Sequence, residues 1–168
     1  MKVIAIVGKK KAGKTTLAAT LIKRFSRPST YIYDINNEYT RKFNLRNDYT
    51  GEINTDKFLT KVAQVKNSLI VFEEATSYFS SKGREAQLVD IISRSRHTNN
   101  VVILIFHSIA DFPRYIYTFT DYIGLFKTND FRSSLDQKLR KNEHFISIYD
   151  RVRYNSSQNY FEFFENVN

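Results

Sequence analysis

Short runs of apolar residues recur along the chain, and most of them end at a polar loop. They occupy residues 1–7, 30–34, 68–72, 101–106 and 122–126. A run that is apolar at nearly every position is typical of a strand buried on both faces of a parallel sheet. These runs therefore predict the strands of a central sheet.

Between these runs, apolar residues return at helical spacing. The pattern predicts helices over residues 17–25, 55–65 and 85–97, a short helix at 113–117 and another over 131–140. Strands and helices that alternate in this way indicate an α/β fold, with a mostly parallel central sheet and helices on both faces.

Four further segments complete the prediction. Residues 40–54 are polar and suggest a surface excursion with one short strand, and residues 78–84 suggest an exposed loop. The alternation in residues 145–149 predicts a strand, and a polar turn then leads into residues 160–164, which pair back or lie along the sheet edge as a C-terminal β extension. The length of 168 residues suits a single domain spanning 1–168.

The net charge of the chain indicates a polyanionic partner, which the fold class alone does not. There are 26 Lys and Arg against 17 Asp and Glu, so the net charge is +9, which favours nucleic acid over other partners. The absence of cysteine excludes a disulfide framework and thiolate metal sites, and agrees with a cytosolic protein. No apolar run approaches the roughly 20 residues of a membrane span.

The loop after the first predicted strand has the form G-x-x-x-x-G-K-T, the Walker A pattern, between a strand and a helix. In that context the loop acts as a P-loop, whose backbone N–H groups wrap a phosphate chain. Lys14 then reaches the β- and γ-phosphates of ATP, Thr15 ligates Mg²⁺, and the helix N-terminus adds partial positive charge. The expected nucleotide-binding residues are Gly8, Lys9, Lys10, Lys11, Ala12, Gly13, Lys14, Thr15 and Thr16.

A second signal is the pair Glu73-Glu74 at the end of the buried run 68–72, which fits a Walker B strand. Such a strand delivers carboxylates to the carboxyl edge of the sheet, beside the P-loop. We assign Glu73 to Mg²⁺ and Glu74 to the water that attacks the γ-phosphate. The polar loop 34–39 ends at the same edge, where ligands of open α/β sheets bind, although an Asx-stabilised turn explains it equally well.

The ordered set of these motifs resembles the HerA/FtsK superfamily of DNA-pumping ATPases. The set comprises the P-loop, Asp34 to Tyr39, Glu73-Glu74, and Arg94 to His97 leading into the strand 101–106, and it spans residues 1 to about 126. The small size resembles a genome-packaging ATPase of viruses with an internal membrane. The resemblance implies a RecA-like fold, a ring of subunits around DNA, a capsid or vertex protein as docking partner, and a place in the host cytoplasm or virion.

The resemblance also assigns roles to three further residues. A basic residue matching Arg94 or Arg96 reaches the nucleotide of a neighbouring subunit, and we favour Arg96. His107 stands where the family usually has glutamine; imidazole can still donate to the γ-phosphate, although a simple hydrogen bond at a strand end also accounts for it. Glu73 stands where aspartate is usual, so a carboxylate is retained.

DNA contacts are expected from loops that face the channel of such a ring. The candidate residues are Lys82, Arg84, Lys127 and Arg132.

Three alternatives stay open at this point. Lys9 lies where partition-type ATPases carry an extra lysine, but Lys10 and Lys11 replace their paired glycines and Glu73-Glu74 is foreign to them. A small nucleotide or metabolite kinase needs an acceptor site and a mobile arginine-bearing lid, which the region from Arg140 to Arg153 fits only loosely. A phage assembly factor with a related ATPase core normally carries a membrane span.

Overall fold

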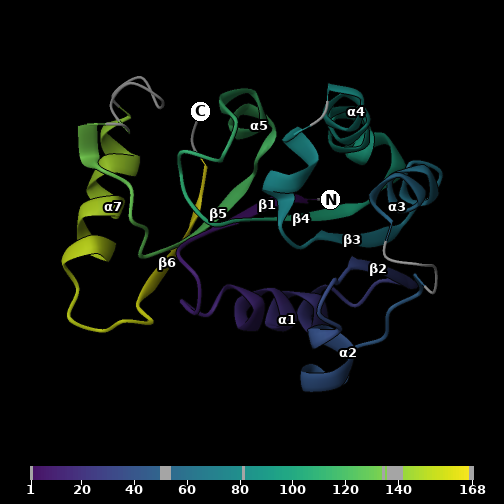
Figure 1. Cartoon of the computed structure of the whole chain (residues 1–168), viewed down its shortest axis with the longest axis horizontal. Coiled ribbons are helices and arrows are strands. Elements are labelled where there is room, and N and C mark those ends of the chain that lie inside the picture. Colours follow the sequence, from purple (N-terminus) through teal and green to yellow (C-terminus); the bar gives the residue numbers. More distant parts are fainter. Residues whose placement is uncertain (1, 50–53, 81, 134, 136–141, 167–168) are drawn as a thin grey trace.

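A six-stranded sheet in the order β2-β3-β4-β1-β5-β6 forms the centre of the protein (Figure 1). The computed structural model describes residues 2–49, 54–80, 82–133, 135 and 142–166. Neighbouring strands from β2 to β5 in this order are parallel, and β6 runs antiparallel to β5. The strands are β1 (Lys2–Val7), β2 (Ser29–Tyr33), β3 (Ser68–Phe72), β4 (Val101–Phe106), β5 (Tyr122–Phe126) and β6 (Phe161–Glu165).

Helices cover both faces of this sheet, as the sequence predicts. Figure 1 shows α1 (Lys14–Phe25) and α2 (Glu38–Phe43) below the sheet, and α3 (Thr55–Val62), α4 (Lys82–Thr98) and α5 (Arg114–Phe119) above it. The 3₁₀ helix η1 (Ala75–Ser80) and α7 (Glu143–Tyr154) contribute to the same core as α3, α4 and α5. Because both faces are covered, β1 is apolar throughout: Ile4 and Ile6 pack with α1, while Val3, Ala5 and Val7 pack with the opposite core.

The strand register brings four loops to one edge of the sheet. Val7 pairs with Phe106, and Tyr33 pairs with Phe72, so parallel strands end almost level. The residues that follow β2, β3, β4 and β1 are Asp34, Glu73, His107 and Gly8, in the order of the strands across the sheet. Segments far apart in the sequence therefore meet at this carboxyl edge.

Two predictions about irregular segments are wrong. In the described part of residues 40–54 there is no strand; residues 38–43 form α2, a short helix in which Tyr39 is fully buried. Residues 78–84 are not an exposed loop, because Tyr78 is buried in η1 and α4 begins at Lys82. In both places one buried aromatic side chain anchors a helical turn that polar composition conceals.

A third prediction, the strand at residues 145–149, is also wrong, because this segment belongs to α7. Its buried residues are Phe145, Ile146, Ile148, Tyr149 and Val152, which recur at helical spacing. Asn142 caps the helix by accepting a hydrogen bond from the Phe145 N–H. The predicted helix 131–140 lies mostly outside the described residues, whereas the C-terminal β extension is confirmed as β6.

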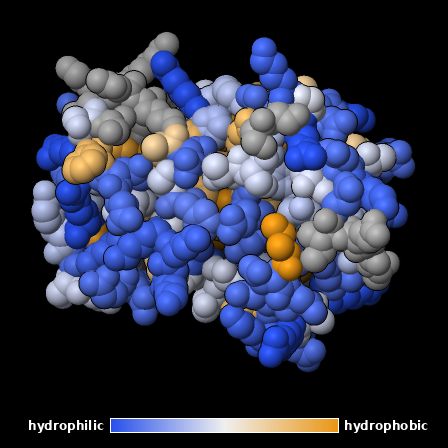
Figure 2. Space-filling view, in the orientation of Figure 1, coloured by the Kyte–Doolittle hydropathy of each residue, from blue (hydrophilic) through white to orange (hydrophobic). Residues whose placement is uncertain are grey.

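The face of the molecule seen in Figure 2 is mainly polar. Figure 2 shows a largely hydrophilic face with scattered hydrophobic side chains. Within the described residues, no helix has the length and apolar character needed to cross a membrane.

Candidate active site

The loop of residues 8–15, hereafter loop 8–15, depends on both of its glycines. A Cβ on Gly8 would lie 2.5 Å from the Cβ of Phe126, so the strand can pass Phe126 only with glycine there. Gly13 has φ 105°, a left-handed conformation that glycine adopts without steric cost. Gly13 is also the N-cap of α1, whose first turn contains no acidic residue. The exposed N–H groups and dipole of this helix therefore face an environment suited to an anion.

Lys14 is the buried cation of this loop, with only 6% of its surface exposed. Its Nζ donates a hydrogen bond to the Lys9 carbonyl at 2.9 Å and lies 3.4 Å from Nδ1 of His107. Burial lowers the pKa of Lys14, and the nearby carboxylates of Glu73 and Glu74 partly offset that effect. A buried ammonium held by so few partners is prepared to bind an incoming phosphate.

Glu73, the first residue after β3, receives hydrogen bonds on both carboxylate oxygens. The Thr15 hydroxyl donates to Oε1 at 3.2 Å, and the Tyr39 hydroxyl donates to Oε2. Burial raises the pKa of Glu73, while these two hydrogen bonds act in the opposite direction. Thr15 and Glu73 thus meet as expected from the sequence, although they lie on different elements.

Glu74 turns the chain away from β3 with φ 58°, a left-handed conformation that is strained for a residue with a side chain. Successive residues of a regular strand point to opposite faces. This turn instead lets Glu73 and Glu74 line the same cavity. The Glu74 carboxylate lies 3.1 Å from Nε2 of His107, a polar contact without the alignment of a hydrogen bond.

His107 joins the acidic and basic sides of the site. Lys14 carries only donors, so Nδ1 of His107 must be the acceptor in that contact and Nε2 carries the hydrogen that faces Glu74. Lys14, His107 and Glu74 therefore form one polar chain across the end of β4. His107 lines the cavity between Lys14 and Glu74, and its role as a sensor stays a prediction.

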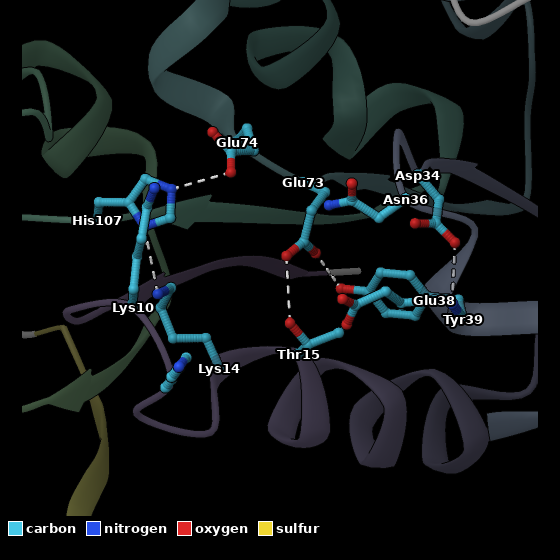
Figure 3. Close-up of a pocket in the computed structure, with 11 residues that line it drawn as sticks. Lys10, Lys14, Thr15, Asp34, Asn36, Glu38, Tyr39, Glu73, Glu74 and His107 are labelled. Carbon is cyan, nitrogen blue, oxygen red and sulfur yellow. Dashed lines mark hydrogen bonds and ion pairs between the residues drawn. The ribbon is translucent and has the colours of Figure 1, made fainter. Parts of the chain in front are cut away.

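These side chains surround a cavity of about 270 Å³ at the carboxyl edge of the sheet. Figure 3 shows basic groups from loop 8–15 facing carboxylates from the ends of β2 and β3. The cavity is lined by Lys10, Lys11, Lys14, Thr15, Asp34, Asn36, Glu38, Tyr39, Glu73, Glu74 and His107.

Thr15 and Glu73 are a candidate pair of ligands for a divalent cation in this cavity. In the described part of the chain, no group of three or more histidine or acidic side chains is arranged to hold a metal ion. Thr15 and Glu73 place a hydroxyl and a buried carboxylate beside each other, and Mg²⁺ is commonly held by one or two such oxygens together with substrate phosphates. The pair fits Mg²⁺ bound jointly with a nucleotide, and does not form a cage for a metal alone.

The two predicted arginines lie away from this cavity. They are near the C-terminal end of α4, where Arg94 pairs with Asp90 at 3.1 Å and Arg96 lies 3.5 Å from Asp121. Asp121 immediately precedes β5, so Arg96 is at the amino edge of the sheet, opposite the site. The structure does not bring either arginine to this cavity of its own chain, and action on a neighbour stays a prediction.

The four candidates for DNA contact differ in whether their side chains already have a polar partner. Lys82 is exposed in the first turn of α4, whereas Arg84 pairs with Asp56 at 2.8 Å. Lys127 donates to the carbonyl of Asn155, and Arg132 pairs with Asp150 at 3.0 Å. Lys82 is therefore the best of the four for a contact with a polyanion.

Sequence reasoning missed the part played by Tyr39. This residue is fully buried, donates from its hydroxyl to Glu73, and has its backbone N–H held by Asp34 at 2.8 Å. Burial, together with the negative charge of Glu73, raises the pKa of Tyr39, which keeps the hydroxyl protonated as a donor. The signal in the sequence was an aromatic residue directly after the polar end of a strand.

Comparison with solved structures shows the same fold in virus proteins. The B204 DNA-packaging ATPase of Sulfolobus turreted icosahedral virus superposes with a TM-score of 0.72 at 16% identity, covering 98% of this chain and 92% of that one. The genome packaging NTPase B204 of Sulfolobus turreted icosahedral virus 2 gives 0.75 at 19% identity with AMPPCP, and 0.70 at 20% with ATP-gammaS, with the same coverages. No protein-family model and no curated protein sequence matches the chain. The chain thus has the fold of these NTPases.

Proposed function

We propose that this protein is an ATP-hydrolysing motor of the genome-packaging kind, with a RecA-like P-loop core. The observation that carries the proposal is the convergence of Lys14, Thr15 and the Glu73-Glu74 pair on one cavity beside a glycine loop. The likeness to B204 proteins supports it, since the B204 NTPase of Sulfolobus turreted icosahedral virus 2 was solved with AMPPCP and with ATP-gammaS. The insertion of β4 between β1 and β3 supports it too, because that order puts His107 between the loop and the acids.

The reaction follows from the chemistry of each group. Backbone N–H groups of loop 8–15 and the ammonium of Lys14 hold the phosphates and offset the charge that develops on them. A water molecule attacks the γ-phosphorus and gives its proton to Glu74 as the bond from that phosphorus to the β-phosphate oxygen breaks. The products are ADP and inorganic phosphate. The single N–H of His107, on Nε2, faces Glu74; by donating to a γ-phosphate oxygen in place of Glu74 it would report whether that phosphate is present.

Mg²⁺ bound with ATP neutralises charge on the β- and γ-phosphates. Thr15 and Glu73 would hold the ion, and Tyr39 keeps the Glu73 carboxylate in position between them. The Glu73 pKa, raised by burial, implies that this carboxylate gains from a cation nearby.

The coupling to DNA forms the second part of the proposal. The net charge of +9 suits a polyanion, and a ring of subunits would allow Arg94 or Arg96 of one subunit to approach the nucleotide of the next. A capsid or vertex protein is the expected docking partner.

The kinase alternative loses support from α7. There Arg151 pairs with Glu162 at 2.6 Å and Arg153 contacts Tyr149, so neither arginine is free to act from a mobile lid.

The test is phosphate release from ATP in the presence of Mg²⁺, measured with and without duplex DNA. A second assay offers a panel of nucleoside monophosphates as possible phosphate acceptors. We expect hydrolysis to ADP that DNA stimulates irrespective of its sequence, and no phosphorylated acceptor. Transfer of the γ-phosphate to a monophosphate would identify a kinase. ATP-dependent pairing of two subunits without a ring would favour the partition-type alternative.

A further inference from the structure

A second cavity lies on the other side of loop 8–15 and has a different chemical character. Its volume is about 510 Å³, within the range of small-molecule sites. Its lining includes Gly13, Thr16 and Leu17 at the start of α1, and Phe126, Asn159 and Phe161 from the end of β5 and the start of β6. Charged residues dominate the first cavity, whereas aromatic and aliphatic side chains dominate this one.

The C-terminal β extension builds this second cavity. Phe161 of β6 stacks on Phe126 of β5, with ring centroids 4.6 Å apart and planes 20° apart. Phe126 in turn lies directly against Gly8 and Gly13. The Phe161 ring therefore continues the surface of loop 8–15 outward, and 39% of the residue remains exposed to the cavity side or solvent.

Side-chain contacts hold the turn before β6 against loop 8–15 and against Lys127, the residue that follows β5. Lys9 donates from Nζ to the Gln158 carboxamide oxygen at 3.2 Å, and Lys127 donates to the Asn155 carbonyl. This turn carries Asn159 and leads directly to Phe161. Its position is thus tied to the loop that we assign to phosphate binding.

The direction of a bound nucleotide links the two cavities. Its γ-phosphate end belongs near Glu74 and His107 in the first cavity, and Lys11 lines both cavities. Thr16, in the first turn of α1, lines only the second. If the triphosphate runs along loop 8–15 from Glu74 toward Thr16, the nucleoside attached to its α-phosphate lies in the second cavity.

We propose that the second cavity is the nucleoside subsite, with a purine base stacked on Phe161. This inference rests on the proposed function and adds a residue that determines base affinity. Base–aromatic stacking suits the exposed ring because every base has a π-face, and a purine offers the larger one. Asn159, which also lines the cavity, carries a carboxamide that can both donate to and accept from the edge of the base.

The test compares ATP with inorganic tripolyphosphate, which has the phosphates but no base, by calorimetry in the presence of Mg²⁺. Parental protein should bind ATP more tightly than tripolyphosphate. Phe161→Ala should weaken ATP binding about tenfold, within the range for loss of one base stack, and leave tripolyphosphate binding unchanged. Phe161→Leu keeps apolar volume against Phe126 and should show the same selective loss even if the alanine variant folds poorly.

Phe163→Ala is the matched control. Phe163 lies two residues along the same strand with 41% exposure, but it stacks on Tyr122 and does not line the cavity. The Phe163→Ala protein should bind ATP and tripolyphosphate with the parental affinities. Parental affinity of both Phe161 variants for ATP, or an equal loss of ATP and tripolyphosphate, would overturn the subsite while leaving the phosphate site intact. If the parental protein binds neither ligand, the proposed function itself fails and this inference fails with it.

Discussion

The Tyr39 hydroxyl donates a hydrogen bond to the Glu73 carboxylate, joining the start of α2 to the end of β3. Glu73 is buried and its pKa is raised, and this hydrogen bond is among the contacts that limit the rise because it stabilises the charged form. The relationship makes Tyr39 a positioning residue for the carboxylate assigned to Mg²⁺.

Tyr39→Phe should therefore raise the pKa of Glu73 further. At a given pH a larger fraction of Glu73 is then protonated, so the acid side of the pH–rate profile for ATP hydrolysis should move to higher pH. Tyr115→Phe is the matched control, because the Tyr115 hydroxyl also donates to a carboxylate, that of Glu85, away from the site. Identical profiles for parental protein and Tyr39→Phe would contradict the positioning role.

Lys14→Ala should reduce ATP hydrolysis by roughly 100-fold or more, because it removes the buried charge that offsets developing phosphate charge. Phosphate release at saturating ATP measures the effect. Lys23→Ala, on the last turn of the same helix, removes an exposed lysine and should leave the rate unchanged. A Lys14→Ala protein with parental activity would place the reaction elsewhere.

Arg96→Ala alone should be nearly inactive if Arg96 acts on a neighbouring subunit, since such fingers contribute ~10³–10⁵ in rate. Mixing it with Glu74→Gln subunits, whose Arg96 is intact, should restore hydrolysis at the mutant's own loop 8–15. Mixed rings that form yet stay inactive would rule out action in trans. Arg94→Ala in the same mixing experiment distinguishes the two arginines.

DNA affinity should fall steeply with salt and be independent of sequence, because phosphate contacts release counterions. Fluorescence anisotropy with a duplex of arbitrary sequence, titrated at 50 and 200 mM salt, measures this. Lys82→Ala should lower the slope of log affinity against log salt by about 1. Lys66→Ala, an exposed lysine just before the amino end of β3, is the control and should not. An affinity that hardly changes with salt would count against the DNA motor.

The sequence predicts most of the sheet and the central acids because those features depend on local pattern. β3 and β4 are buried at every position, and Glu73-Glu74 follows β3 directly. The strand prediction for residues 145–149 failed because a window of five residues is too short to fix the period. Phe145, Ile146, Ile148 and Tyr149, together with Val152 one turn later, follow the spacing of a buried helix face. The link from Tyr39 to Glu73, and the contact of Phe161 with Phe126, join residues far apart in sequence, so no local pattern encodes them.

Glu74→Gln tests the central claim most directly, because it neutralises the group that accepts the proton from water and keeps its size. ATP binding to the variant, followed by calorimetry, should match the parental affinity within a few-fold. Turnover of the same preparation should fall by ~10²–10⁴, the usual contribution of a general base. If Glu74→Gln hydrolyses ATP at the parental rate, the assignment of Glu74 to the attacking water is wrong.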